Sequence, residues 1–185
     1  MGELTGKNIL MVIPKNQFCE EELFITRSHL ESAGARTVIL SPSGREAAGM
    51  KKNRFQPHGM VIDWNRQQGI TGKYGAVLVT GGKGSPKSLW NDPILPQILT
   101  DHYRAGKIVG AIGLSVAVLA KASLLKGLAA GPDQEAFLKT LDDCGIQHVD
   151  DPVTRDDRII TARGAEAAVQ FAETVVKVFA EQNEP

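Results

Sequence analysis

The sequence contains little cysteine, few aromatic residues and no excess of charge of either sign. Cys19 and Cys144 are its only cysteines, too few for a disulfide framework, and no CxxC motif or Cys/His cluster indicates a structural zinc site. The chain has 21 basic and 21 acidic residues, hence a formal net charge of +0. This balance gives no reason to expect nucleic acid or an anionic membrane as the main partner. We expect neither a metal ion nor an organic cofactor.

Long uninterrupted apolar runs are also missing. The N-terminal run at residues 9–13 is stopped by Pro14 and Lys15, so we expect no export signal. The longest apolar stretch, residues 108–130, is interrupted by lysines and glycines, which favours a buried strand followed by a buried helix over a membrane helix. With 42% hydrophobic and 23% charged residues, the 185-residue chain has the composition of a globular protein. We expect one domain over residues 1–185 in a soluble, cytoplasmic protein.

The chain alternates between strand and helix patterns. Continuous apolar runs predict buried strands at residues 8–13, 37–40, 76–80, 108–112 and 159–162. Periodic segments predict helices at residues 19–33, 93–104, 115–125, 133–143 and 165–180. The irregular segment from residue 45 to 74 holds one short strand candidate, residues 60–64. Repeated β-then-α units indicate a mostly parallel sheet with helices on both faces, an α/β/α domain of three layers.

Ligands in folds of this kind bind beyond the carboxyl ends of the strands. One such loop begins with Gly81 and Gly82, and two glycines allow backbone N–H groups to approach a ligand and form an anion hole. The alternative is a tight turn in which Ser85 caps the helix that begins near Pro86. Neither GxxxxGK[ST] nor GxGxxG spacing occurs in this loop, which excludes the nucleotide-binding loops that these motifs define.

The turn after residue 112 has the strand–turn–helix pattern of a nucleophile elbow. One register, Gly113-x-Ser115-x-Ala117, makes Ser115 the nucleophile. The other places Gly113 at the elbow, and Ser115 then caps the following helix. We favour the second register, because no histidine stands in an obvious triad context, although His148 with two nearby aspartates follows the elbow in sequence.

These segments resemble the ThiJ/PfpI superfamily, which includes the parkinsonism-associated deglycase and PfpI-type intracellular peptidases. The similarity covers most of the chain. It is clearest at residues 107–127 (KIVGAIGLSVAVLAKASLLKG), and it extends to LVTGG at 78–82, to residues 19–34 and to IITARG at 159–164. The resemblance implies a flavodoxin-like, class I glutamine amidotransferase-like fold. It also implies a homo-oligomer, either a dimer or a larger ring.

The family elbow carries a cysteine, and Gly113 stands at that position here. Leu114 stands where histidine or alanine is common, Ser115 where glycine is usual, and Gly131 near a position that holds histidine or tyrosine in many members. The resemblance therefore implies that the nucleophile and its polar companions are absent. Because Gly113 and Gly131 are both small, we expect an opening in the floor of the pocket.

The family also has a glutamate on the helix after the first strand, twelve residues before the glycine that ends the helix. Counting back from Gly34 gives Glu22. Helical spacing alone does not choose among Glu20, Glu21 and Glu22, and a first-turn carboxylate is also favoured by the helix dipole. With the family register, Glu22 becomes the candidate acid/base that faces the pocket.

The two cysteines are secondary candidates for functional residues. Cys19 lies near a helix N-terminus, which would lower its pKa, but three adjacent glutamates would raise it. We favour a structural role for Cys19 over redox sensing, and we expect Cys144 to pack in the core.

Two functions follow from this reading. The first is an inactive family member that binds a small polar molecule between Glu22, the amides of Gly81 and Gly82, and the Gly113 turn, in a stress-related role. The second is a glyoxalase, deglycase or peptidase that uses Glu22 and water. We favour the first function, because cysteine-dependent covalent chemistry requires a thiol.

Overall fold

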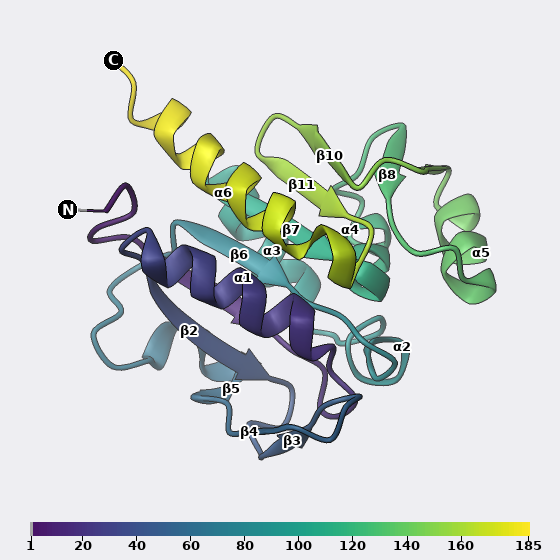
Figure 1. Cartoon of the computed structure of the whole chain (residues 1–185), viewed down its shortest axis with the longest axis horizontal. Helices are drawn as coiled ribbons and strands as arrows, with labels where there is room; N and C mark the ends of the chain where they lie inside the picture. Colours follow the sequence, from purple (N-terminus) through teal and green to yellow (C-terminus); the bar gives the residue numbers. More distant parts are fainter. Residues whose placement is uncertain (1) are drawn as a thin grey trace.

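The core of the structure is a sheet with the strand order β10-β11-β7-β6-β1-β2-β5 (Figure 1). The structure is a computed structural model, and it describes residues 2–185. The strands of this sheet are β1 (Asn8–Val12), β2 (Arg36–Ser41), β5 (Gly59–Met60), β6 (Ala76–Val79), β7 (Ile108–Ile112), β10 (Val153–Asp156) and β11 (Ile159–Ala162). All neighbours pair in parallel except β10, which is antiparallel to β11. The mostly parallel sheet expected from the sequence is confirmed.

The central strands are apolar on both faces because helices cover both faces. In β1, Leu10 pairs in register with Val38 of β2 and Val77 of β6. Leu10 belongs to the core on one side of the sheet, whereas its neighbours Ile9 and Met11 belong to the core on the other side. This alternation is the two-residue period of a strand, and it explains why the run shows no polar face.

The helices form the two outer layers. On one face α1 (Glu20–Ser32) packs against α6 (Ala168–Gln182). The other face is covered by α3 (Leu95–Arg104) and α4 (Val116–Lys121), with α5 (Glu135–Asp143) packed against α4. The short helix α2 (Ser85–Ser88) follows β6. The described residues therefore form the three-layer α/β/α fold, which places the carboxyl ends of β1, β6 and β7 at one edge.

One expected strand is wrong. Residues 60–64 do not continue as a strand, since pairing with β2 ends at Met60 and a 3₁₀ helix spans Val61–Arg66. The apolar pattern there does not reflect a buried face, because Met60 and Ile62 are 40% and 56% exposed. In this short segment Val61 is buried in the core, and the partly buried Trp64 packs against it.

Two small sheets were not predicted from the sequence. They consist of β3 (Ala47–Ala48) with β4 (Arg54–Phe55), and of β8 (Leu128–Ala130) with β9 (Gln147–Val149). Strands of two or three residues are too short to produce a periodic pattern. Both small sheets lie outside the main sheet, so their absence from the prediction does not change the layer arrangement.

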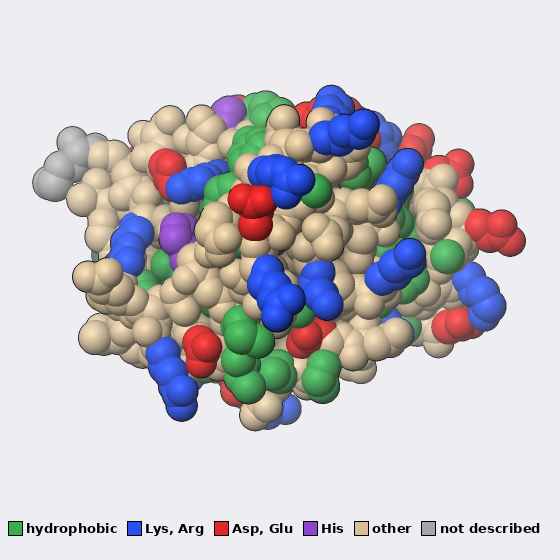
Figure 2. Space-filling model, turned by 90° about the horizontal axis from the view of Figure 1, so that it is seen from below, with side chains coloured by type: hydrophobic (Ala, Val, Ile, Leu, Met, Phe, Trp, Pro, Cys, Tyr) green, Lys and Arg blue, Asp and Glu red, His purple; other side chains and the backbone are tan. Residues whose placement is uncertain are grey.

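The surface agrees with the balanced charge of the sequence. On the face shown in Figure 2, Lys and Arg side chains are spread over the surface with Asp and Glu side chains among them. Within residues 2–185, no helix combines the length and the apolar character that crossing a membrane requires.

A buried histidine connects α3 to the loop before β6. His102 is fully buried, its Nε2 accepts a hydrogen bond from the Tyr74 N–H at 3.2 Å, and its Nδ1 donates to the Ile98 carbonyl at 2.7 Å. The ring of Trp64 packs against it edge-on with centroids 5.1 Å apart. Burial lowers the pKa of His102 below its usual value of 6.5, so the native state holds the imidazole neutral.

We expect the unfolding free energy of the wild type to fall more steeply than that of His102→Gln as the pH drops from about 7 to about 5. The unfolded chain takes up a proton near the usual pKa of 6.5, whereas native His102 resists protonation. The stabilisation is therefore complete above that pKa and is lost below it, by about 1.4 kcal/mol per pH unit at most. Urea denaturation at several pH values measures the difference, with His29→Gln on the exposed side of α1 as the control. Equal pH slopes for wild type and His102→Gln would contradict the prediction.

Candidate functional site

Three loops meet backbone to backbone at the carboxyl ends of β1, β6 and β7. The Cys19 N–H donates to the Gly81 carbonyl at 2.8 Å. A Cβ on Gly81 would lie 3.0 Å from the Ile112 carbonyl oxygen. Gly82 has φ +126°, and a Cβ there would collide with the backbone of residues 17–19. The glycine pair is thus required by the close approach of these loops, whatever else its amides bind.

Glu22, in the first turn of α1, directs its carboxyl group into this junction. The side chain is 5% exposed, and its Oε1 accepts a hydrogen bond from the Gly81 N–H at 2.8 Å. Burial raises the pKa of Glu22 to about 8, and the nearby carboxylates of Glu166 and Glu21 add to the rise, while the Gly81 bond opposes it. At neutral pH the carboxyl group is therefore mostly protonated.

The same carboxyl group occupies the space beside Gly113. Gly113 directly follows β7 at the elbow and has φ +67°, a conformation that glycine adopts without strain. A Cβ on Gly113 would lie 2.5 Å from Oε2 and 2.7 Å from Oε1 of Glu22. At Gly131 the ring of Phe137 takes the corresponding space. The opening expected in the pocket floor is therefore absent at these two glycines, because neighbouring side chains fill it.

Ser115 and Ser85 bond to each other and cap no helix. The Ser115 hydroxyl is fully buried and donates to the Thr80 carbonyl at 2.8 Å, which leaves the Ser85 hydroxyl to donate to Ser115 Oγ at 2.7 Å. Neither serine makes a side-chain capping bond to α2 or α4. The capping roles expected for both residues are wrong, because the buried carbonyl at the end of β6 needs a donor. The pair connects the start of α2 to the elbow, where the indole N–H of Trp90 also donates to the Leu114 carbonyl at 2.8 Å.

The two cysteines lie in different surroundings. Cys19 is buried, its thiol donates to a carboxylate oxygen of Glu21 at 3.5 Å, and burial, with the nearby Glu22, raises its pKa to about 12. The thiol is therefore a poor nucleophile at neutral pH. Cys144 is exposed, so the expected core packing is wrong. It follows α5 directly, and the chain returns to the core only at Ile146.

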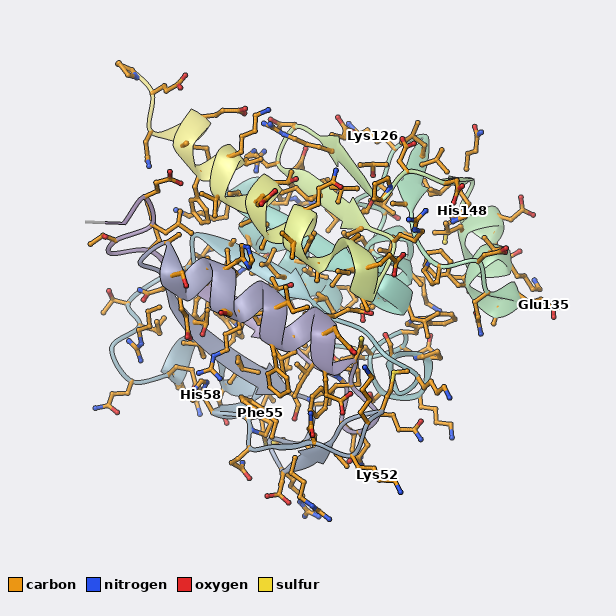
Figure 3. The ribbon with its side chains drawn as sticks, viewed as in Figure 1. Lys52, Phe55, His58, Lys126, Glu135 and His148 are labelled. Carbon is orange, nitrogen blue, oxygen red and sulfur yellow. The ribbon has the colours of Figure 1, made fainter. Side chains whose placement is uncertain are left out.

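The histidines are dispersed over the fold. His58 and His148 lie far apart in Figure 3, one beside β5 and the other near α5. Nδ1 of His58 accepts from the Ile39 N–H at 2.8 Å, and Nε2 of His148 lies 2.7 Å from the Gly131 carbonyl oxygen. Residues 2–185 contain no group of three His, Cys, Asp or Glu side chains placed to hold a metal ion. No pairing of serine and histidine is thus found at the elbow.

Glu20 has a role that the sequence did not reveal. It is 4% exposed, and its Oε2 accepts from the Lys51 N–H at 2.7 Å and from the Asn53 N–H at 3.3 Å. Glu21 forms an ion pair with the Lys51 side chain, and Glu22 faces the strand ends. Successive helical residues point about 100° apart, so three adjacent carboxylates reach three different surroundings. Contacts with residues 49–53, which are remote in sequence, explain why Glu20 is buried.

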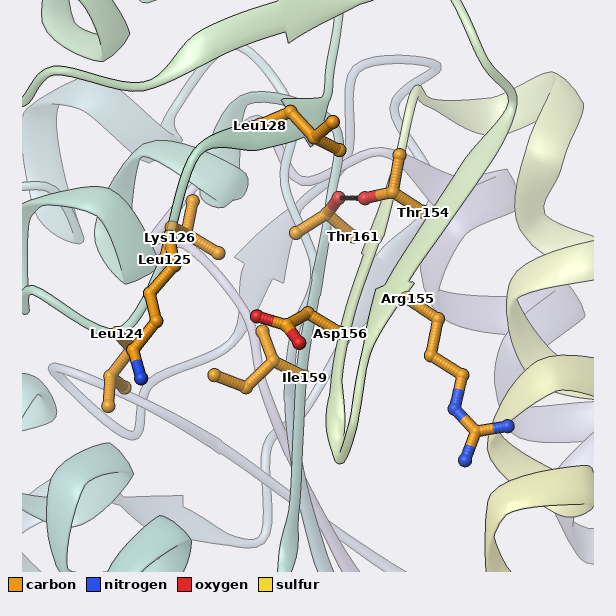
Figure 4. Close-up of a pocket in the computed structure, with 9 residues that line it drawn as sticks. All are labelled: Leu124, Leu125, Lys126, Leu128, Thr154, Arg155, Asp156, Ile159 and Thr161. Atoms are coloured by element: carbon orange, nitrogen blue, oxygen red, sulfur yellow. Dashed lines mark hydrogen bonds between the residues drawn. The ribbon is translucent and has the colours of Figure 1, made fainter.

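A separate cavity of about 220 Å³ lies between residues 124–128 and the β10–β11 hairpin (Figure 4). The carboxylate of Asp156 points into it, and the hydroxyls of Thr154 and Thr161 bond to each other at its wall. None of its lining residues belongs to the three loops that meet at Glu22. This cavity is therefore not part of the candidate site.

A three-layer, flavodoxin-like fold with a strand–turn–helix elbow beside a buried glutamate defines the class of this protein. Residues 7–178 match the DJ-1/PfpI family, and the chain belongs to that family. The resemblance noted in the sequence is thereby confirmed.

Relatives and solved structures agree with this assignment. The chain is 34% identical over 183 residues to the uncharacterized protein MJ0967 of Methanocaldococcus jannaschii, covering 98% of this chain and 86% of that protein. It is 25% identical to the glutathione-independent glyoxalase DJR-1.2 of Caenorhabditis elegans, over 92% of this chain and 88% of the relative. A ThiJ/PfpI domain protein from Brachyspira murdochii superposes with a TM-score of 0.84 at 25% identity, over 96% of this chain and 98% of the other.

We expect the unfolding free energy of the wild type to fall relative to that of Glu22→Gln as the pH rises from about 5.5 to about 7.5. Native Glu22 keeps its proton up to a pKa of about 8, whereas the unfolded chain releases it near 4.5. Stability that depends on the protonated carboxyl is thus complete below 4.5 and is lost as the pH rises towards 8, by about 1.4 kcal/mol per pH unit at most. Chemical denaturation measures the slopes. Glu21→Gln is the control, since the lowered pKa of Glu21 keeps it ionised in both states over this range. Parallel curves for wild type and Glu22→Gln would refute the prediction.

Gly113→Ala should destabilise the protein by about 1–3 kcal/mol, and by less in a Glu22→Ala background. The new methyl group meets the Glu22 carboxyl group, and truncating Glu22 removes that clash. Gly145→Ala is the matched control, because Gly145 has φ +74° but open space where a Cβ would lie. Its cost should be the same with and without Glu22→Ala. A double-mutant cycle by urea denaturation measures the coupling, and a coupling of zero between positions 22 and 113 would contradict the assigned contact.

Proposed function

We propose that this chain is a catalytically inactive DJ-1/PfpI protein that binds a small polar molecule in a stress-related role. The observation that carries the proposal is the geometry at Gly113, where the elbow has no side chain and the Glu22 carboxyl group fills the adjacent space. By the resemblance of residues 107–127, Gly113 stands at the position of the family's cysteine. Covalent chemistry of the cysteine type needs a thiolate at that position.

Other potential nucleophiles near the elbow are poorly suited to replace that cysteine. The pKa of Cys19 is raised to about 12, so the thiol stays protonated. The Ser115 hydroxyl is buried and donates to a backbone carbonyl, and a serine nucleophile needs a base at its hydroxyl. These two observations support an inactive elbow.

The backbone N–H of Gly81 already has a hydrogen-bond acceptor within the protein. An oxyanion hole requires backbone N–H groups aimed at a developing negative charge on the substrate. Here the Gly81 N–H donates to Glu22 Oε1 at 2.8 Å, so a side chain of the protein takes the donor that a substrate oxygen would need. Because the Gly81 N–H and the Glu22 carboxyl group bond to each other, this arrangement favours a stable structural junction over a reactive site.

One observation favours a second function, a glyoxalase, deglycase or peptidase-type hydrolase that uses Glu22 and water. A pKa of about 8 places the Glu22 carboxyl close to neutral pH, where a general acid or base is most effective. A relative that is 25% identical is a glutathione-independent glyoxalase. We rank this function second, because Glu22 is buried and already hydrogen-bonded.

Methylglyoxal consumption by the purified protein, measured beside Glu22→Gln and Glu21→Gln, separates the two functions. We expect all three proteins to consume no more methylglyoxal than buffer, since no activated nucleophile is present at the elbow. Turnover by wild type and Glu21→Gln that is lost in Glu22→Gln would overturn the proposal in favour of the second function. Turnover that survives in all three would also contradict inactivity and would place the chemistry away from Glu22.

A further inference from the structure

A crevice lies between the segments that follow β1 and β6, at the point where the order of the strands reverses. After β1 the chain adds β2 on one side of it, and later adds β6 on the other side. The chain leaves β1 towards α1 on one face of the sheet and leaves β6 towards α3 on the other face, and a crevice at such a point is where open α/β sheets bind ligands. A cavity of about 390 Å³ lies at this point, within the usual size range of small-molecule pockets. It is lined by Lys15, Asn16, Gln17, Gly84, Lys87 and Ser88.

Hydrogen bonds between the two loops hold the walls of this β1–β6 crevice in place. The Lys15 N–H donates to Ser88 Oγ at 3.1 Å, and the Ser88 hydroxyl donates to the Gly84 carbonyl at 3.0 Å. The Gly84 N–H in turn donates to the Gln17 carbonyl at 3.2 Å. A Cβ on Gly84 would collide with the carbonyl oxygen of Asn16, so only glycine permits this approach. The crevice is therefore formed before any ligand arrives, which reduces the entropic cost of binding.

The lining of the crevice carries positive charge and no acidic side chain. Lys15 and Lys87 are exposed, and neither forms an ion pair with another residue in the range 2–185. The side-chain oxygen of Asn16 accepts from the Ala48 N–H at 3.1 Å, which leaves its NH₂ group as a donor. Because the whole chain has a net charge of +0, these two lysines are a local excess and do not reflect a generally basic protein.

We propose that the β1–β6 crevice binds a small molecule bearing a phosphate or carboxylate group. The ammonium groups of Lys15 and Lys87 neutralise the anion, and the Asn16 amide donates a hydrogen bond to it. This inference goes beyond the proposed function, because it assigns a binding site away from the elbow and names the chemical class of its ligand. Its site shares no residue with the Glu22 junction, so the two proposals can fail separately.

Isothermal titration calorimetry at constant ionic strength tests the proposal with inorganic phosphate, citrate and glucose 6-phosphate, and with glucose as the neutral comparison. We expect the wild type to bind at least one of the three anions and not glucose. Lys15→Gln/Lys87→Gln should weaken that binding by about tenfold or more, because it removes both cations. Lys73→Gln/Lys177→Gln removes the same charge from exposed positions elsewhere and should leave the affinity unchanged. Comparing phosphate with citrate distinguishes a phosphate site from a carboxylate site.

Two results would overturn the proposal: binding of none of the three anions by wild type, or equal weakening in both double variants. Thermal unfolding of each variant shows whether it is folded, and Lys15→Arg/Lys87→Arg, which keeps the charge, should retain binding. Anion binding together with Glu22-dependent methylglyoxal turnover would contradict the inactive function but not this site. An absence of both would contradict this site but not the inactive function.

Discussion

The hydrogen bond from the Gly81 N–H to the Glu22 carboxyl group is the interaction on which the candidate site depends. It fastens the first turn of α1 to the loop after β6, and it brings the carboxyl group against Gly113 at the end of β7. Burying a carboxyl group is unfavourable unless it is neutral or well paired. The raised pKa of Glu22 removes the charge, the Gly81 bond satisfies one oxygen, and the close contact at Gly113 leaves no room for a side chain on the elbow. One buried group thus determines the protonation, the packing and the permitted residues of the junction.

The layer arrangement and most of the main strands were predictable from the sequence, because buried parallel strands leave continuous apolar runs. Choosing Glu22 among three adjacent glutamates required the family register, since helical periodicity gives no preference. The burial of Glu20 was not predictable, because its partners are backbone N–H groups at positions 51 and 53, and a backbone donor leaves no trace in the amino-acid pattern. The bond between Ser85 and Ser115 was missed for a related reason: each serine also stands at a position where a helix cap is the usual explanation.

The glycines of these loops are required for two different reasons, a close backbone contact and a contact with a side chain. Gly81, Gly82 and Gly84 allow loops to approach each other's backbones, and each would meet a carbonyl oxygen if it carried a Cβ. Gly82 and Gly113 also have a positive φ, and at Gly113 the atoms that a Cβ would meet belong to the Glu22 side chain. Backbone contacts cannot yield, whereas a side chain can rotate away. Of these positions, Gly113 is therefore the one at which a change in a single neighbouring side chain removes the clash with a Cβ, which leaves only the strain of the left-handed backbone conformation.

The positions of the chain ends bear on how the protein can be handled. Helix α6 returns antiparallel to the strands, so its last turn lies at the amino ends of the sheet, and the first described residues lie on that same side (Figure 1). The Glu22 junction and the β1–β6 crevice both lie beyond the carboxyl ends. A purification tag, a fluorophore or a surface tether joined to either terminus would therefore extend away from both sites and cover neither of them.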